Sequence, residues 1–415
     1  MNLGGYLSGY IADNFGRRKA LLYSTFILFL MELFSTFVDQ FTMFLIMNFL
    51  ISVMVGISSI VCMSYLIEWL PIKNRSLIMS YSQLYPLGMI ILNCFALLAI
   101  ENNQMIYWKW LQRSISIISL LCFFILKIFC YESPKFYISR QKFDEVFKIL
   151  DKVGNHAKVA LSETEKAHIM EHARSEECHQ METSYKELFK GVFIRITLVI
   201  ISFRLLSSLL NYGTLFILPI LLGKNSLNNT TSIYDSTLGF LYTNLLSLPA
   251  PFIRGVLTEI KCLGRKYTIF ISCIMTLIGF TASLYFYEYL MFSVGFSRLA
   301  LNIASGTLVI YNTEAFPTKI RTLALGIISG ITRIGAISSP YICFYLVQIS
   351  PYACFYCFMI VIIVCGFLCL LLPMDTRGMS LDNMKEMKKK ISEEDLFKMN
   401  NAKNMKQENE EALSV

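Results

Sequence analysis

Charged residues are scarce in this chain. Only 16% of its 415 residues are Asp, Glu, Lys or Arg, whereas 55% are hydrophobic. An ordinary soluble domain carries about 25% charged residues, because its surface has to be hydrated. The composition therefore excludes such a domain and indicates a protein with several membrane spans.

Patterns for metal, nucleotide or covalent chemistry are also scarce. The chain has four histidines, and His168, His172 and His179 lie in a polar central segment where a solvated helix face is favoured over a metal site. Twelve cysteines fall mostly inside apolar runs without metal-ligand spacing, which indicates small core residues. The sequence shows no phosphate-cradling glycine loop and no nucleophile–base pair. We therefore expect no enzyme activity, no cofactor and no ATP-driven pumping.

Long apolar runs dominate the chain. A helix needs about 20 residues to cross roughly 30 Å of hydrocarbon. Ten runs are long enough, so the sequence predicts an all-α membrane protein with ten complete spans. The runs cover residues 20–38, 41–66, 76–99, 112–131, 192–222, 235–255, 267–287, 289–311, 323–347 and 351–373.

The positive charges indicate the orientation of the spans. A net charge of +8 would suit an anionic partner such as a nucleic acid, but most cations lie in alternate short joints between the apolar runs. The positive-inside rule places these joints in the cytoplasm, and no nucleic acid is needed to explain them. Asn228 and Asn229 begin overlapping glycosylation sequons on the predicted outer side, although Asn74 begins another on the inner side. We take the outer pair as candidate glycosylation sites.

Two segments of the form E-x-x-P-x-K-x-R recur 246 residues apart. They cover residues 68–75 and 314–321, and each lies between two apolar runs. Gly16-Arg17-Arg18 recurs in a similar position as Gly264-Arg265-Lys266. The repetition predicts a duplicated chain, and two like halves in a membrane are typical of a transporter.

Three segments resemble signatures of the major facilitator superfamily. The signature between that family's second and third spans is similar to Gly9-x-x-x-Asp13-x-x-Gly16-Arg17-Arg18. The one after its sixth span is similar to Glu132-Ser133-Pro134-Lys135-Phe136, and the one at its end is similar to residues 373–378. The resemblance runs from residue 3 to about residue 381. It implies a transporter fold of two helical bundles.

Within the superfamily, the chain is most similar to the branch of organic cation and anion transporters and synaptic-vesicle-protein-related transporters. This likeness depends on residues 108–111, 211–213 and, above all, 311–340. Sugar transporters rank second, because the Gln-Gln pair usual in their seventh span is absent from residues 203–216.

The resemblance divides the chain into four parts. Residues 1–131 form a partial N-terminal bundle equivalent to spans 2–6, residues 132–190 a cytoplasmic helical linker, residues 191–373 a C-terminal bundle equivalent to spans 7–12, and residues 374–415 a disordered cytoplasmic tail. About a dozen residues precede the first inner joint, which is too few for a span. We expect the first span and half of the second to be missing from this sequence, with a natural short form as the alternative.

Charged residues of the inner-face motifs are candidate gates. A carboxylate that faces an Arg or Lys of a neighbouring joint holds two spans together while the inner side is closed. The alternative is that the basic residues only orient the spans, which leaves the acids unexplained. Asn14 and Lys261 depart from the family pattern, and we expect a weaker contact in the second half. The candidate gating residues are Asp13, Arg17, Arg18, Glu68, Arg75, Arg265, Glu314 and Arg321.

Polar side chains at mid-depth are candidate solute ligands, because a charge there costs about 2.5–3.5 kcal/mol on insertion scales. Arg333 lies 12 residues beyond Arg321, about 18 Å into the membrane, and Arg204 is at a similar depth. Together they favour an anionic or zwitterionic solute, unless they form structural ion pairs. Glu32 is interpreted as a structural acid and Arg298 as a snorkelling residue. Further candidates, with helix packing as the alternative, are Tyr85, Tyr242 and Asn302.

The resulting hypothesis is a multi-pass transporter that moves a small organic solute, with organic ions as first candidates, by alternating access. A sugar or other neutral solute is one alternative, and a non-transporting vesicle or receptor-like membrane protein is another. The expected partners are the solute, the lipid bilayer and, as an option, a coupling ion. The candidate locations are the plasma membrane and an intracellular vesicle membrane.

Overall fold

The structure, a computed structural model, describes residues 2–71, 75–101, 107–138, 140–157, 192–223, 229–260, 263–286, 289–316, 318–350 and 352–372. Within these ranges the chain is helical and contains no strand, which confirms the predicted all-α class. The expectations for the histidine-bearing central segment and for the tail concern residues outside these ranges.

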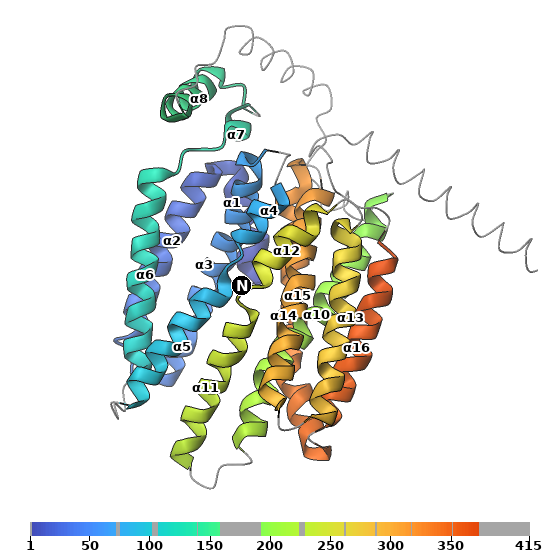
Figure 1. The fold of residues 1–415 in the computed structure, drawn as a ribbon. Helices are drawn as coiled ribbons and strands as arrows, with labels where there is room; N and C mark the ends of the chain where they lie inside the picture. The colour runs from blue at the N-terminus through green and yellow to red at the C-terminus, as the bar shows by residue number, and fades with distance from the viewer. Residues whose placement is uncertain are drawn as a thin grey trace, which may run out of the picture. The chain divides into compact units, whose positions relative to one another are not determined.

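The first half of the chain forms eight described helices (Figure 1). They are α1 Asn2–Phe15, α2 Arg17–Ser35, α3 Phe41–Trp69, α4 Arg75–Tyr81, α5 Tyr85–Glu101, α6 Tyr107–Phe129, α7 Pro134–Ile138 and α8 Phe143–Ala157.

The second half forms seven described helices. They are α10 Val192–Gly223, α11 Asn229–Ser247, α12 Ala250–Glu259, α13 Gly264–Tyr285, α14 Leu290–Ala315, α15 Thr318–Ile349 and α16 Ala353–Leu370.

Eight stretches of the described residues are long and apolar enough to cross a membrane, so the prediction of ten complete spans is not confirmed. The predicted run at 20–38 corresponds to α2, which begins with three consecutive cations and contains the buried Glu32. The predicted run at 235–255 is interrupted at Pro249, and it becomes α11 and α12. Proline lacks an N–H and clashes with the preceding turn, which explains this interruption.

Backbone contacts divide the chain into two compact units. The first comprises Met1–Leu70, Cys94–Tyr185 and Lys319–Arg333, and the second comprises Pro71–Asn93, Lys186–Thr318 and Ile334–Val415. The division predicted from the sequence follows chain order, whereas these units exchange segments. In particular, α4 and the start of α5 belong to the second unit, and the start of α15 belongs to the first.

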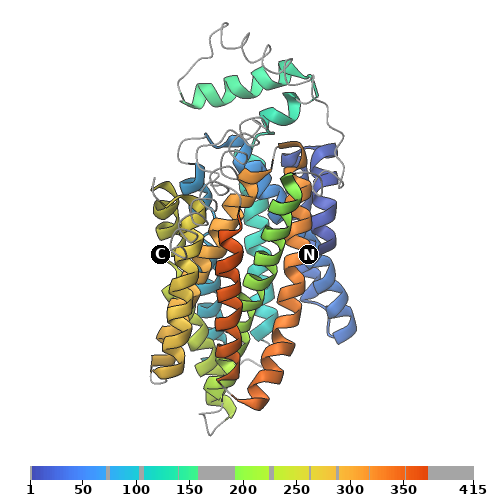
Figure 2. The same cartoon turned by 90° about the vertical axis from the view of Figure 1, so that its right-hand side faces the viewer.

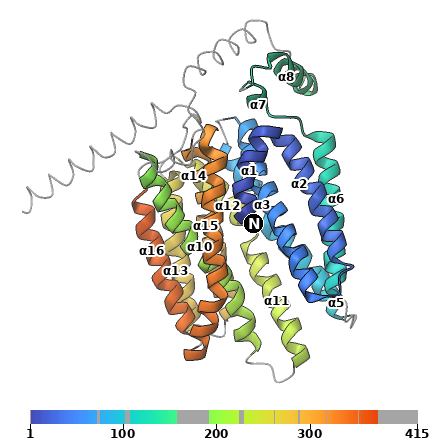
Figure 3. The same ribbon diagram turned by 180° about the vertical axis from the view of Figure 1, so that it is seen from behind.

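In the first unit, α2 packs along α3 and α6, and α1 packs on α3 (Figures 1 and 3). Gly4 allows α1 to approach α3 closely, because a Cβ atom there would overlap the backbone carbonyl of Val53. The short helix α7 packs on α8, beyond the end of α6 (Figure 1). The buried apolar residues at the junction of α1, α2 and α3 are Ala12, Ala20, Leu21, Ile57 and Val61.

In the second unit, α14 is buried along most of its length and packs against α10, α11, α12 and α13. Helix α16, red in Figure 2, packs against α13 and against the green α10. The rings of Phe280 and Phe358 lie 5.5 Å apart between α13 and α16. Gly213 on α10 leaves room for the Phe358 ring, which a Cβ atom would meet at 2.7 Å. Helix α14 also carries Arg298 and Asn302 of the polar cluster described below.

Candidate gates and solute site

The repeated Gly-Arg segments share a backbone conformation. Gly16 precedes α2 and Gly264 begins α13, and their φ angles are 96° and 56°. Residues with a side chain are strained in this left-handed region. At Gly16, an added Cβ atom would also lie 2.5 Å from Glu132 Oε2. The sequence repeat is therefore a structural repeat as well.

In the first half, Arg17 at the start of α2 lies beside Glu68 near the end of α3. Arg17 Nε is 3.4 Å from Glu68 Oε1, and the Glu68 side chain is 2% exposed. Arg17 Nη1 also donates to Ala12 O at 3.5 Å, and its guanidinium lies 5.5 Å from the centre of the Phe136 ring. The ion pair ties the inner ends of α2 and α3 together.

Glu132 caps the start of α2. Its Oε1 accepts hydrogen bonds from the backbone N–H groups of Arg18 at 3.0 Å and Ser133 at 3.3 Å. A carboxylate is favoured at a helix N-terminus because the first N–H groups lack intrahelical partners and carry partial positive charge. Arg18 Nη2 donates to Lys127 O near the end of α6 at 3.0 Å. The two motifs at residues 9–18 and 132–136 therefore contact each other in the first unit.

In the second half, Arg265 and Glu314 form a buried bidentate ion pair. Arg265 Nε donates to Glu314 Oε2 at 3.1 Å and Nη2 donates to Oε1 at 3.0 Å, and the two side chains are 4% and 5% exposed. Arg265 Nη1 also donates to Thr258 O at 3.2 Å. We expected the weaker contact in this half because of Lys261. By distance and burial it is the tighter of the two.

Arg75 and Arg321 end the two E-x-x-P-x-K-x-R repeats, and both are buried. Two of the five points at which the chain changes unit fall inside these repeats, after Leu70 and after Thr318. Each repeat is therefore a point at which the chain passes from one unit to the other. The predicted site residues whose side chains lie outside the described part of the chain are Asp13, Asn228 and Asn229.

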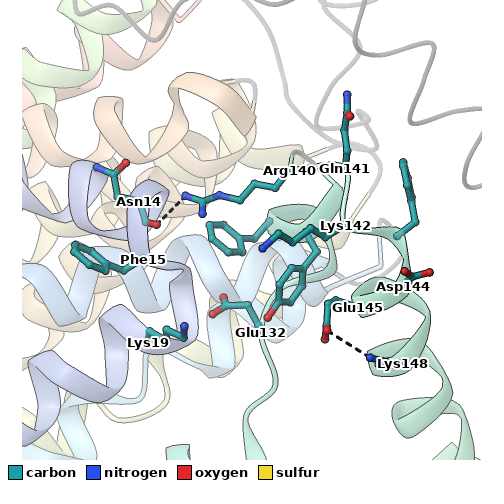
Figure 4. Close-up of a pocket in the computed structure, with 13 residues that line it drawn as sticks. Asn14, Phe15, Lys19, Glu132, Arg140, Gln141, Lys142, Asp144, Glu145 and Lys148 are labelled. Carbon is teal, nitrogen blue, oxygen red and sulfur yellow. Dashed lines mark hydrogen bonds and ion pairs between the residues drawn. The ribbon is translucent and has the colours of Figure 1, made fainter.

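A cavity of about 850 Å³ lies at one end of the first unit, where α7 and α8 meet the joint between α1 and α2 (Figure 4). Arg140 Nη2 donates to Asn14 O at 2.7 Å, and the Arg140 guanidinium lies 4.6 Å from the centre of the Phe136 ring. The lining includes charges of both signs, such as the exposed pair of Glu145 and Lys148 at 3.5 Å. We interpret this cavity as part of the contact between the linker helices and the first inner joint. The charged lining residues are Lys19, Glu132, Arg140, Lys142, Asp144, Glu145 and Lys148.

A second polar cluster lies inside the second unit, where α5 begins next to α14. The Tyr85 hydroxyl donates to Asn302 Oδ1. Tyr85 is 50% exposed, whereas Asn302 is buried. The structure thus joins two residues that the sequence indicates as separate candidates.

Arg254 on α12 lies next to this contact and is absent from the sequence-based candidates. It is fully buried, and its Nη2 donates to Ser80 O at 2.8 Å while its Nη1 donates to Asn302 O at 3.3 Å. Ser80 is in the last turn of α4, where carbonyl groups lack regular intrahelical donors. Gly306 provides the space, because a Cβ atom there would overlap the guanidinium. Arg254 therefore holds α4 against α12 and α14.

Arg298 does not snorkel, contrary to our expectation. It is 5% exposed, and it donates to Thr243 Oγ1 at 3.2 Å and to Asn244 Oδ1 at 3.5 Å on α11. Arg298 precedes Asn302 by four residues, so both lie on the same face of α14. The buried neutral oxygens of α11 replace the aqueous surface that we expected around this cation.

The remaining solute candidates divide between the two units. Arg204 on α10 is half-buried and lies within electrostatic reach of the Tyr85 hydroxyl, as do Arg254 and Arg298. Tyr242 on α11 belongs to the second unit too and is 49% exposed. Arg333 is half-buried and belongs to the first unit. The cluster is therefore defined by residues of the second unit.

The sequence holds a partial signal for Arg298, which is interpreted above as snorkelling, and for Arg254, which is absent from the candidates. Arg298, Asn302 and Gly306 recur every four residues, which places them on one helix face. Arg254 follows the prolines of a broken apolar run by a few residues. Its contact with Ser80 depends on the end of α4, which hydropathy does not reveal.

Glu32 has a hydrogen-bond partner inside the first unit. The hydroxyl of Ser119 on α6 donates to Glu32 Oε2 at 2.6 Å. Glu32 is buried between α2 and α6, which agrees with its interpretation as a structural acid.

The described helices of both units and the repeated Gly-Arg and Glu motifs are typical of a protein of the major facilitator type, and comparison with known proteins gives the family. The chain matches the "Sugar (and other) transporter" family over residues 2–387 and belongs to it. The match confirms the superfamily resemblance.

Among proteins, the chain is 25% identical to bovine solute carrier family 22 member 1 over 394 residues, which are 92% of this chain and 65% of that protein. It is 26% identical to mouse solute carrier family 22 member 2 over 395 residues, which are 92% of this chain and 66% of that protein. The chain thus spans about two thirds of the length of these relatives.

Among solved structures, the chain resembles the proton:xylose symporter XylE with a TM-score of 0.75 at 18% identity, over 93% of this chain and 86% of that one. It resembles the human organic anion transporter MFSD10 with a TM-score of 0.63 at 15% identity, over 89% and 80%. Both likenesses concern the fold.

Proposed function

We propose that the protein is a secondary or facilitative transporter that moves a small organic solute across a membrane by alternating access. Membership of a transporter family and the duplicated chain support this proposal. The single observation that carries it is that the chain changes unit inside both E-x-x-P-x-K-x-R repeats, at two of its five changes of unit.

The inner-face ion pairs act as gates in this proposal. Arg17 with Glu68 and Arg265 with Glu314 each join the inner ends of neighbouring helices, next to the point where the chain changes unit. The chain passes from one unit to the other at five points, and movement of one unit against the other must bend the chain there, including at the two points inside the repeats. Ion pairs beside them bias the population of the inward-closed state, because breaking a buried pair is costly.

Flux through reconstituted protein tests the proposal. The full-length protein is reconstituted in proteoliposomes, and the vesicles are loaded in turn with unlabelled benzoate, tetraethylammonium or glucose. Uptake of the same solute in radiolabelled form is then measured. We expect saturable counterflow of at least one solute, reduced in Glu314→Gln. Absence of counterflow for every solute in protein that remains monodisperse would leave the non-transporting alternative.

A neutral solute is the second candidate. The family description and the fold likeness to a xylose symporter favour it. Saturable glucose counterflow without an organic-ion signal would support it.

A pH gradient across the same vesicles tests for a coupled proton. Imaging of the tagged protein in its native cells decides between the plasma membrane and a vesicle membrane.

A further inference from the structure

We infer that Arg254 and Arg298 form a binding site for the carboxylate of an organic anion, which names the solute class and rests on the proposed function. The two guanidinium groups are buried in the second unit, near the half-exposed Tyr85. The neighbouring Asn302 links them, since its carbonyl accepts from Arg254 and it lies one turn from Arg298.

Both cations have neutral partners among the described residues. Arg254 donates to two backbone carbonyls, and Arg298 donates to a hydroxyl and a side-chain amide oxygen. Burying a charge is costly unless an opposite charge accompanies it. The carboxylate of a solute would supply that charge, and a guanidinium suits the geometry of a carboxylate better than an ammonium does.

The unsatisfied atoms of the cluster are all donors. Arg254 Nε, Arg298 Nε and Asn302 Nδ2 are buried without a hydrogen-bond partner, and so is Nε2 of the adjacent Gln83. A buried polar group without a partner loses its hydrogen bonds to water and gains none in exchange. Such groups are therefore rare in proteins unless a water or a ligand binds to them. Four N–H donors without an unmatched acceptor suit an anion and are a poor fit for a cation.

Tyr85 indicates an organic rather than an inorganic anion. Its side chain is 50% exposed, and its hydroxyl donates to Asn302 of the cluster. Its ring offers an apolar surface beside the donors. A carboxylate attached to an aryl or alkyl group would use both features.

Ligand-induced stabilisation of the purified full-length protein tests the inference. Benzoate and 4-phenylbutyrate are compared with their uncharged amides and with benzylamine, each in a thermal-unfolding titration at constant ionic strength. We expect both carboxylates to raise the unfolding temperature at concentrations where the amides and the amine do not. Equal responses to acid and amide, or a response to the amine alone, would overturn the inference.

Variants assign the effect to the arginines. Arg298→Gln should weaken the apparent affinity for benzoate by about tenfold or more, because a charge-assisted hydrogen bond is lost, and Arg298→Lys should retain part of it. Gly306→Ala, which displaces the Arg254 guanidinium, should weaken binding too. The matched control is Arg113→Gln on α6. The Arg113 guanidinium lies 5.2 Å from the centre of the Trp110 ring in the first unit, and its replacement should leave benzoate binding unchanged.

The outcomes separate this inference from the proposed function. Benzoate stabilisation that persists unchanged in both Arg298→Gln and Gly306→Ala overturns the assigned site. Counterflow of glucose or tetraethylammonium without any carboxylate response overturns the solute class while the transporter proposal stands. If Arg298→Gln does not fold, benzoate stabilisation that persists unchanged in Arg298→Lys and Gly306→Ala overturns the assigned site.

Discussion

Gly16 shows how one residue without a side chain positions an inner-face motif. Its φ of 96° is available to glycine at little cost, and its missing Cβ atom leaves room for the Glu132 carboxylate that caps α2. Glycine at this position therefore serves both the backbone turn and the contact between motifs.

Gly16→Ala should destabilise the protein by about 1–3 kcal/mol, because alanine is strained at this φ and its methyl group would displace Glu132. Detergent-solubilised protein can be unfolded chemically to measure the change. Gly88→Ala on α5 is the matched control, since a Cβ atom there has no neighbour within 4 Å. Alanine in a helix interior should leave that variant as stable or slightly more so. Equal stability of both variants would contradict the structural role of Gly16.

The ion pair of Arg265 and Glu314 gives a second prediction at the scale of single residues. Removing one partner leaves the other charge buried without an opposite charge. This should lower the free energy of unfolding by about 3–5 kcal/mol. A double-mutant cycle with Arg265→Gln and Glu314→Gln should show strong coupling, with the double variant less damaged than the sum of the single ones.

The exposed pair of Glu145 and Lys148 provides the comparison for that cycle. Its side chains are 48% and 68% exposed, and its coupling should be only about 0–1 kcal/mol. Similar coupling in the two pairs would contradict the inference that burial makes the second-half pair an effective gate.

At the scale of elements, helix ends explain what hydropathy missed. The runs at 76–99 and 235–255 each read as one apolar span, yet each is broken into a short inner helix and a longer one. The first break lies just before Pro86, and the second contains Pro249. A proline limits the backbone conformation of the residue before it. The sequence predicts the spans, but it does not predict that Arg254 on α12 would reach Ser80 at the end of α4.

Close helix crossings make another testable feature at this scale. Within the first unit, α1 crosses the start of α15 at Gly5 and Gly326, and a Cβ atom at Gly326 would lie 2.5 Å from Gly5 O. Small residues at such crossings let two backbones approach in a membrane.

Gly326→Ala should therefore separate α1 from α15 and lower the unfolding temperature. Because the neighbouring atom is backbone rather than a flexible side chain, relaxation cannot remove the clash cheaply. Thermal unfolding of the purified variant measures the effect, with Gly366→Ala as control, where the nearest atom is 3.9 Å away on Phe270. A Gly326→Ala protein that unfolds at the same temperature as the control would show that the crossing is not tight.

At the scale of the whole molecule, the sequence indicates the class, the family resemblance and the duplication, because these depend on composition and local motifs. It also indicates the residues of the two repeated ion pairs, since acids at inner joints need an explanation beyond orientation. It does not indicate which helices form each compact unit, since the exchange of residues 71–93 and 319–333 depends on contacts between segments far apart in the chain. The same limit explains the missed Arg254.

This exchange predicts how a divided chain would behave. A fragment of residues 1–185 lacks the segment 319–333 of the first unit, and a fragment of residues 186–415 lacks the segment 71–93 of the second. Neither fragment should be stable alone, whereas co-expressed fragments should copurify, because each completes the other's unit. Gel filtration and thermal unfolding of tagged fragments measure this, and the pair carrying Gly88→Ala should copurify as well as the unsubstituted pair. Fragments that are each monodisperse and cooperatively folded when expressed separately would contradict the exchange and support the predicted division in chain order.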